Sequence, residues 1–212
     1  MEYFVFDTEA SGMGEKAELI QFAGIRLTED LKIKGLVNWF CNINTIVEPE
    51  ALAIHKLDNA KIAKLSGGNY FEDYLMLPEA DWLRNPKDIT FIAYNTRFDK
   101  RIINQTLKLN GYGEVNFGRK ETLVPNKLSN GVYNFCLMEA CNSVFNHNLY
   151  NKSLKEMVAN QTRYPDREIM SMLDKLCKQF KINNCDTGFH GALFDALATT
   201  LLLHSNRRYF FK

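Results

Sequence analysis

The chain has 212 residues, of which 46% are hydrophobic and 24% are charged. This balance is ordinary for a globular protein, and we expect one domain over 1–212. The formal net charge of +1 argues against a protein that wraps duplex DNA, because such binding depends on many Lys and Arg contacts to phosphate. A small footprint on one strand end is compatible with this charge.

The cysteines and the amino-terminal residues indicate the compartment. Five cysteines form no Cys-x-x-Cys pair, and we expect reduced thiols: Cys41, Cys136, Cys141, Cys177 and Cys185. The first four residues run straight into a strand pattern, with no basic segment and no apolar stretch of signal-peptide or membrane-spanning length. We therefore expect a cytoplasmic protein without a membrane partner.

The amino-terminal part predicts a three-stranded antiparallel meander. Aromatic, β-branched and alternating apolar residues place its strands at Tyr3–Phe6, Leu19–Leu27 and Lys34–Ile43. Helical spacing follows over Ala51–Lys64 and breaks near Asp58, a residue suited to cap a second short helix.

The rest of the chain alternates helix and strand patterns before it becomes mainly helical. The expected segments are a helix-like Phe71–Leu83 interrupted by Pro78, a buried strand Ile89–Ala93, a helix Arg97–Leu109, a long loop Asn110–Gly131, a strand feeding a helix over Val132–Phe145, a capping box at Ser153 and Glu156, and helices Asp166–Phe180 and Gly191–His204. This order is an α/β or α+β pattern without an internal repeat.

Two carboxylates stand near the end of the first strand. Asp7 and Glu9 are two residues apart, so both side chains point to the same face of the strand. Two unpaired carboxylates on a largely buried strand are costly, and hard cations such as Mg²⁺ prefer carboxylate oxygens. The alternative is that Asp7 caps a turn and Glu9 is solvated at the strand end.

Two later segments carry further candidates for the same chemistry. Asp99 lies in the first turn of the helix that follows Asn95, where an acid also suits the helix dipole without any function. His190 and Asp195 would lie ~140° apart on one helix. With His190 on the preceding loop, its ring can reach a site lined by Asp195, as a general base must. Asp195 stands in an apolar helix and needs a partner, whereas a lone histidine is often purely structural.

These three segments together resemble the DEDDh branch of the 3′-to-5′ exonucleases, and the resemblance covers nearly the whole chain. The residues that carry it are Phe6-Asp7-Thr8-Glu9 continuing into Ser11-Gly12, Asn95-Thr96-Arg97-Phe98-Asp99, and the His190 to Asp195 pair. A further similarity is the run from Pro49 to Ile54-His55, where the family's histidine packs on the terminal nucleotide. The glycine that usually follows is Lys56 here.

The resemblance implies a ribonuclease-H-like α/β fold, with a mixed five-stranded sheet flanked by helices. It implies two Mg²⁺ ions, replaceable by Mn²⁺, held by Asp7, Glu9, Asp99 and Asp195, with Asp99 acting through water and His190 as general base. Two such ions can clamp the attacking and leaving oxygens of an in-line displacement at phosphorus. The residues implied at the substrate are Thr8, Ser11, Gly12, His55 and Asn95.

The implied reaction releases nucleoside 5′-monophosphates from single-stranded DNA or RNA 3′ ends. Cations that could hold such a strand are Arg97, Lys100, Arg101, Arg119, Lys120, Lys127, Lys152 and Lys155. The alternative is a catalytically weak nucleic-acid-binding or proofreading module that acts with a polymerase. In a third interpretation, the aromatic tail 207–212 docks on a partner such as a sliding clamp. The alternative is that this tail is an edge strand or packs against the rest of the protein. Some relatives form homodimers.

Overall fold

The computed structural model describes residues 2–121, 131–145, 153–184, 188 and 190–210. Several residues named above lie outside this part of the chain: Lys127, Lys152, Cys185, Phe211 and Lys212. No helix among the described residues is long and apolar enough to span a membrane.

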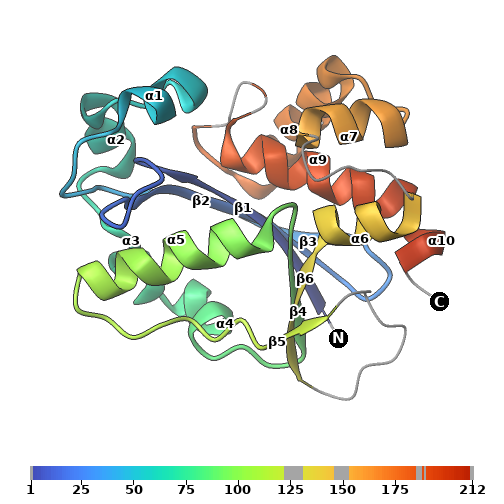
Figure 1. The fold of residues 1–212 in the computed structure, drawn as a ribbon, viewed down its shortest axis with the longest axis horizontal. Helices are drawn as coiled ribbons and strands as arrows, with labels where there is room; N and C mark the ends of the chain where they lie inside the picture. The colour runs from blue at the N-terminus through green and yellow to red at the C-terminus, as the bar shows by residue number, and fades with distance from the viewer. Residues whose placement is uncertain (1, 122–130, 146–152, 185–187, 189, 211–212) are drawn as a thin grey trace.

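A single mixed sheet forms the centre of the molecule (Figure 1). Its spatial order is β3-β2-β1-β4-β6-β5. The strands are β1 (Glu2–Ala10), β2 (Leu19–Leu27), β3 (Ile33–Phe40), β4 (Ile89–Ala93), β5 (Arg119–Glu121) and β6 (Val132–Cys136). β1, β2 and β3 pair antiparallel, which confirms the predicted meander, while β4 pairs parallel with β1 and β6. The α/β prediction is confirmed, but the sheet has six strands among the described residues rather than five.

The additional strand is β5, which lies inside the segment 110–131 that was predicted to be a loop. Its three residues are all charged and show no apolar alternation, so the sequence gives no strand signal there. β5 forms because it pairs in parallel with β6. On β6, the buried Asn134 donates from its side-chain nitrogen to the carbonyls of Phe117 (3.2 Å) and Gly118 (2.9 Å), which holds the incoming chain at the sheet edge.

Helices cover both faces of the sheet (Figure 1). Those on one face are α3 (Phe71–Leu75), α4 (Asp81–Arg84) and α5 (Thr96–Leu109). Those on the other are α6 (Leu137–Phe145), α7 (Leu154–Gln161), α8 (Asp166–Phe180) and α9 (Ala192–Ser205). α1 (Pro49–His55) and α2 (Asn59–Ser66) pack at one end of the meander. α9 is buried almost all round, as its continuous apolar sequence requires.

The expected helix signals act locally as predicted. The side chain of Asp58 accepts from the backbone N–H of Lys61 (2.7 Å), so it caps α2 where the helical pattern breaks. Pro78 begins a short 3-10 turn between α3 and α4. The capping box of Ser153 and Glu156 begins α7.

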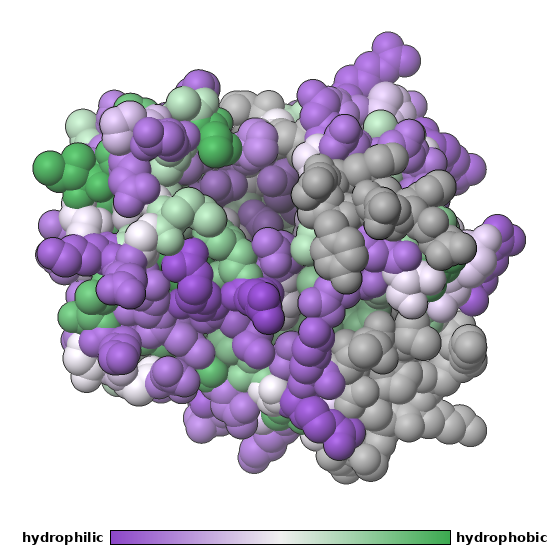
Figure 2. Space-filling model, viewed as in Figure 1, coloured by the Kyte–Doolittle hydropathy of each residue, from purple (hydrophilic) through white to green (hydrophobic). Residues whose placement is uncertain are grey.

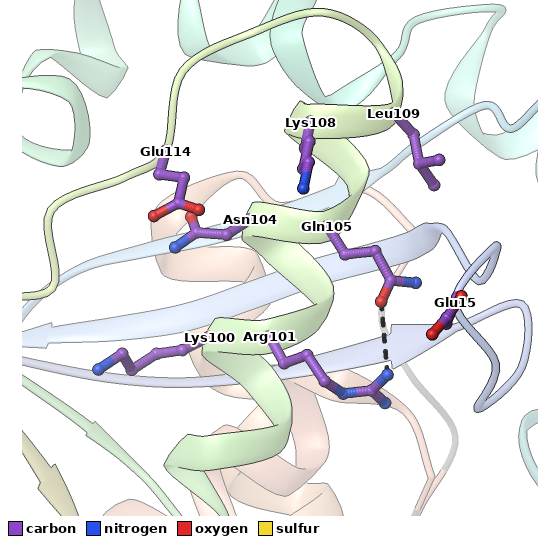
Figure 3. A pocket seen from close by; sticks show the side chains of 8 residues that line it. All are labelled: Glu15, Lys100, Arg101, Asn104, Gln105, Lys108, Leu109 and Glu114. Carbon is purple, nitrogen blue, oxygen red and sulfur yellow. Dashed lines mark hydrogen bonds between the residues drawn. The ribbon is translucent and has the colours of Figure 1, made fainter.

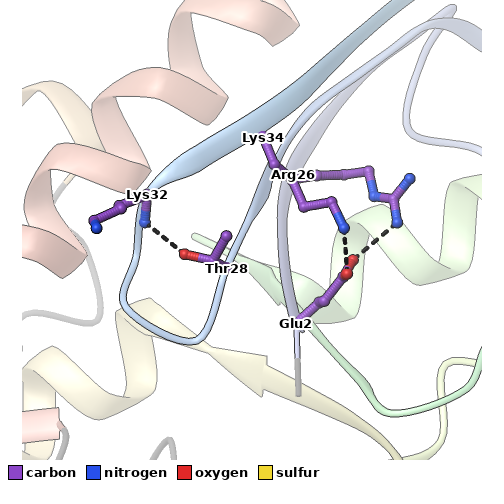
Figure 4. A network of polar contacts seen from close by, with 5 residues as sticks. All are labelled: Glu2, Arg26, Thr28, Lys32 and Lys34. Carbon is purple, nitrogen blue, oxygen red and sulfur yellow. Dashed lines mark hydrogen bonds and ion pairs between the residues drawn. The ribbon is translucent and has the colours of Figure 1, made fainter.

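An ion-pair network ties the first residue of β1 to the other two strands of the meander (Figure 4). Glu2 accepts from Arg26 on β2 (2.8 Å) and from Lys34 on β3. Burial alone would raise the pKa of Glu2, but the hydrogen bonds from Lys34 and Arg26 hold it below its usual value. Nearby, Thr28 accepts from the backbone N–H of Lys32 (3.1 Å) and fixes the turn between β2 and β3.

Close packing between β1 and β2 leads to a first prediction. A Cβ atom at Gly24 would lie 2.2 Å from the ring of Phe4, which is fully buried, whereas a Cβ at Gly35 would approach only the Arg26 side chain at 3.9 Å. We expect Gly24→Ala to destabilise the fold by about 1–3 kcal/mol, because a packed core accommodates added volume poorly. Urea unfolding would measure the loss, with Gly35→Ala as the matched control that leaves the midpoint close to that of wild type.

The carboxyl-terminal aromatic residues pack against the molecule as far as the structure describes them. In α10 (Arg207–Phe210), Phe210 is buried with its ring 6.1 Å from that of Phe135. Tyr209 contacts Phe145 edge-on at 5.5 Å between centroids. This agrees with the packed alternative for residues 207–210.

The cysteines differ from the expectation at one position. Cys41, Cys136 and Cys141 are free and buried, as expected. Cys177 on α8 is disulfide-bonded, so the prediction that all thiols are reduced is wrong for this residue.

Candidate active site

Three carboxylates converge where β1 meets α9. Asp7 and Glu9 are half-buried on β1, and Asp195 is buried in the first turn of α9. One oxygen from each carboxylate lies within 4.8 Å of the others. The two β1 side chains share a face, as their spacing predicted, and α9 packs on that same face. Oxygen-only donors at this separation suit a hard divalent cation such as Mg²⁺ or Mn²⁺.

The segment before α9 is held in an uncommon conformation. His190 has φ +67°, in the left-handed region that non-glycine residues rarely adopt. Its backbone N–H donates to Asp195 Oδ2 (3.2 Å), so the same carboxylate that faces the acidic cluster also fixes the backbone of the histidine. His190 therefore precedes the helix, as expected, rather than lying on it. Strained residues of this kind concentrate at functional sites.

A chain of side-chain amides fastens both ends of this segment to the sheet. The N–H of Ala192 donates to Gln21 Oε1 (3.2 Å), and Gln21 Nε2 donates to Asn38 Oδ1 (2.8 Å). Asn38 Nδ2 in turn donates to the carbonyl oxygen of Asn184 (3.1 Å). Because Gln21 is buried on β2, these bonds position the start of α9, and hence Asp195, relative to β1.

Asp99 lies apart from the three-carboxylate cluster. It is buried in the first turn of α5 and accepts from the Thr8 hydroxyl (2.8 Å). Thr8 lies between Asp7 and Glu9, so its side chain points to the opposite face of β1. Burial raises the pKa of Asp99 to about 7, although hydrogen bonding to Thr8 lowers it in part. The carboxyl group therefore ionises near neutral pH in the absence of a cation.

This raised pKa predicts a pH-dependent stability in metal-free protein. Because the pKa of Asp99 in the folded state lies above its ordinary value of 3.8, the folded state binds the proton more tightly, so this contribution to stability is lost as pH rises towards 7. We expect Asp99→Asn to unfold at higher urea than wild type at pH 8, by up to roughly 4 kcal/mol, with a much smaller difference at pH 5.

Urea unfolding in EDTA at both pH values tests this expectation, with the exposed Asp174→Asn on α8 as control. The lowered pKa values of His55 and His190 cause stability to fall as pH falls, but they are common to both proteins and cancel in the comparison. If the difference in unfolding free energy between Asp99→Asn and wild type does not change with pH, the raised pKa of Asp99 is contradicted.

The two histidines lie near one another across the site. Burial, together with Lys155, lowers the pKa of His190, so its imidazole is neutral at pH 7. Burial also lowers the pKa of His55, and electrostatic repulsion from His190 lowers it further. His55 Nδ1 accepts from the N–H of Leu57 (3.0 Å), which leaves the proton of the neutral ring on Nε2.

A small cavity of about 130 Å³ begins at Glu9. Its wall is formed by the β1 end, α1 and the start of α5, and the surface is hollowed between the parts that lie over α1 and α9 (Figure 2). The lining residues are Glu9, Ala10, Gly12, Met13, Glu48, Glu50, Ala51, Ile54, His55 and Phe98. Met13 and Ile54 are exposed (69% and 52%), so each presents an apolar surface on which a base could stack.

Of the five substrate residues that the sequence implied, Gly12 and His55 line this cavity and the other three do not. Thr8 is bonded to Asp99, and Asn95 is exposed at the start of α5 without capping it. Ser11 is buried, where its hydroxyl accepts from the N–H of Glu18 (2.9 Å). The Ser11 side chain therefore fixes the loop, and the contact of its backbone with the substrate stays a prediction.

Glu48 and Met13 also line the cavity, although no sequence pattern predicted them there. Glu48 accepts from the N–H of Met13 (3.2 Å), and its carboxylate lies where a Cβ at Gly12 would be, 2.1 Å from the built position. Because Gly12 has no Cβ, the Glu48 carboxylate can occupy this space and form part of the cavity wall. No local pattern indicates this contact, because the residues are 35 positions apart.

Comparisons with known proteins agree with this geometry. The model of the RNase T exonuclease family matches residues 4–203, and the chain therefore belongs to this exonuclease family. It is a nuclease of the hydrolase class, and the resemblance drawn from the motifs is confirmed. A search of curated proteins gives no match.

Solved structures share the fold at low identity. The nuclease domain of 3′hExo, described as a DEDDh family member bound to rAMP, is 13% identical with TM-score 0.62, covering 98% of this chain and 92% of that one. Exonuclease I of E. coli, in a zinc-bound complex with single-stranded DNA, is 16% identical with TM-score 0.59. That alignment covers 99% of this chain but 42% of exonuclease I. Exonuclease X with 5′-overhanging duplex DNA is 17% identical, with TM-score 0.51, 97% of this chain covered and 92% of that one.

Proposed function

We propose that the chain is a single-domain, metal-dependent 3′-to-5′ exonuclease that releases nucleoside 5′-monophosphates from single-stranded DNA ends, with RNA as the alternative substrate. The observation that carries this proposal is the convergence of Asp7, Glu9 and Asp195 beside a cavity that begins at Glu9. Family membership supports the hydrolytic chemistry.

The residues fit a pair of divalent cations, of which Mg²⁺ is the natural choice for oxygen donors. Asp7, Glu9 and Asp195 would hold them, with Asp99 acting through water. When bound, such ions stabilise the charge that develops on the phosphate and activate the attacking water.

The chain's own groups supply the remaining requirements. His190 is neutral at pH 7 and can accept the proton of the attacking water. The backbone N–H of His190 donates to Asp195 Oδ2, which tethers the histidine to the residue that begins the acidic side of α9 and supports its assignment as the base. Its proton then passes to solvent, because His190 is exposed.

The cavity would hold the terminal nucleoside. His55 forms part of the wall, and Met13 and Ile54 offer apolar surfaces to the base. A base can enter only if it is unstacked from its neighbour, which favours unpaired ends over duplex ends.

The test is digestion of matched 5′-labelled single-stranded DNA and RNA oligonucleotides with Mg²⁺, with Mn²⁺ and with EDTA. A metal-dependent ladder that shortens from the 3′ end is the expected result, and the relative rates give the sugar preference. Absence of cleavage of both strands with either metal would contradict the proposed enzyme and favour a binding module.

A further inference from the structure

A second hollow runs along α5, beside the cavity described above. It is an open groove of about 850 Å³. Figure 3 shows the eight side chains that line it: Glu15, Lys100, Arg101, Asn104, Gln105, Lys108, Leu109 and Glu114. The surface over α5 is mainly hydrophilic (Figure 2).

Arg101 lies between this groove and the cavity that begins at Glu9. Its guanidinium donates to the carbonyl oxygen of Met13 (3.2 Å) and lies over the ring of Phe98, 5.4 Å from the centroid. Met13 and Phe98 both line the cavity. Gln105 Nε2 donates to the carbonyl of Gly14 (3.0 Å), which fastens the same loop to α5. The cavity and the groove therefore lie on two sides of one wall.

Two lysines carry positive charge along the face of α5 that lines the groove. Lys100, Asn104 and Lys108 follow at intervals of four residues, so they share one face over ~12 Å of helix. Among the described residues, neither lysine forms a salt bridge, and the ammonium group of Lys100 lies 5.8 Å from the ring centroid of Phe117. Burial, together with nearby Lys120, lowers the pKa of Lys100, as expected for a cation without a counter-ion.

Other candidate cations are already engaged. Lys120 pairs with Glu139 (2.7 Å), and Lys155 pairs with Asp166 (3.7 Å). Arg119 lies over the ring of Tyr133 at 5.7 Å. Unlike Lys120 and Lys155, the two α5 lysines have no carboxylate partner among the described residues, and both line the groove.

Resting on the exonuclease function proposed above, we propose that the α5 groove binds phosphates of the substrate strand on the 5′ side of the nucleotide held in the cavity. The ~12 Å between the lysines corresponds to the axial rise of about three to four stacked nucleotides at ~3.4 Å each. Glu15 and Glu114 flank the helix face (Figure 3) and would repel phosphates, which confines the strand to the row of lysines.

The test measures binding and cleavage separately, as a function of strand length. Lys108→Ala is the main variant, because Lys108 lies nine residues from Asp99, ~13 Å along the helix, and outside the cavity. Fluorescence anisotropy in EDTA would give Kd for labelled single-stranded DNA and RNA 12-mers over a range of salt. Steady-state cleavage of a dinucleotide and a 12-mer would give KM for each. Lys175→Ala on α8 is the matched control, since Lys175 is also exposed.

We expect Lys108→Ala to raise Kd and KM for the 12-mers about 3- to 10-fold, equally for DNA and RNA, and to leave the dinucleotide unchanged. The slope of log K against log salt should fall by about 0.7 for the lost contact. Lys108→Arg should restore binding, and Glu114→Gln should tighten it.

Equal Kd values of Lys108→Ala and wild type for the 12-mer would overturn the proposed role of the groove and leave the exonuclease proposal intact. An equal rise in KM for the dinucleotide and the 12-mer would do the same. A third outcome is that wild type binds the 12-mer, Lys108→Ala binds it more weakly, and wild type cleaves no substrate. This would support the groove and contradict the proposed enzyme. Absence of 12-mer binding by wild type would overturn the groove.

Discussion

Asp7→Asn is expected to abolish cleavage, with a loss of at least about 10³-fold in kcat, or about 4 kcal/mol. The side chain keeps its size but can no longer carry a negative charge, so only two of the three converging carboxyl groups remain. A divalent cation is held chiefly by such charge, and it supplies several kcal/mol of transition-state stabilisation. Rates with Mg²⁺ and Mn²⁺ on a 5′-labelled oligonucleotide would measure the loss.

The same substitution should stabilise the protein when metal is absent. Three carboxylates within 4.8 Å of one another repel each other in EDTA, so removal of one charge raises the unfolding temperature. Wild type should gain stability when Mn²⁺ is added, because a ligand that binds only the folded state stabilises it. Asp7→Asn should lose most of this gain.

The exposed Asp174→Asn provides the control for this pair of measurements. It removes one negative charge from α8 and should leave both the rate and the Mn²⁺-dependent stabilisation unchanged. A normal Mn²⁺ response in Asp7→Asn would contradict the ligand role of Asp7, even if activity were lost.

Local periodicity predicted the parts of the candidate site that lie within one element. Asp7 and Glu9 share a face because side chains alternate along a strand, and this rule needs no tertiary information. The place of His190 before α9 followed from its spacing to Asp195 and from the glycine between them. The proximity of Asp195 to β1 required the packing of α9 on the sheet, and the family resemblance supplied that step.

Features that depend on distant partners could not be predicted in this way. β5 has a polar sequence and exists because β6 offers it an edge. Glu48 reaches the cavity because Gly12 leaves room for its carboxylate. The hydroxyl of Ser11 accepts from Glu18 within the protein, a contact that its place in a motif did not indicate. The motifs therefore predicted the family correctly, but they did not indicate these contacts within the protein.

His190→Ala is expected to lower kcat by about 10² to 10⁴ while metal binding is retained, because a general base contributes an effect of this size. In wild type, the rate should rise with pH through a midpoint below 6.5, the ordinary pKa of histidine, since burial and Lys155 lower the pKa of His190 and only the neutral ring accepts a proton. Lys155→Gln should move this midpoint upward and leave the plateau rate unchanged, which distinguishes an electrostatic effect from damage to the site.

The pH profile of His190→Ala separates two groups that could produce the same rise. Asp99 also ionises as pH increases, and in metal-free protein burial raises its pKa to about 7. A bound cation would favour the ionised carboxylate and move that transition to lower pH, away from the range of the assay. We therefore expect the rising limb to disappear in His190→Ala at saturating metal. A limb that persists, and moves to lower pH as metal concentration increases, would assign it to Asp99 and contradict the role of His190 as the base.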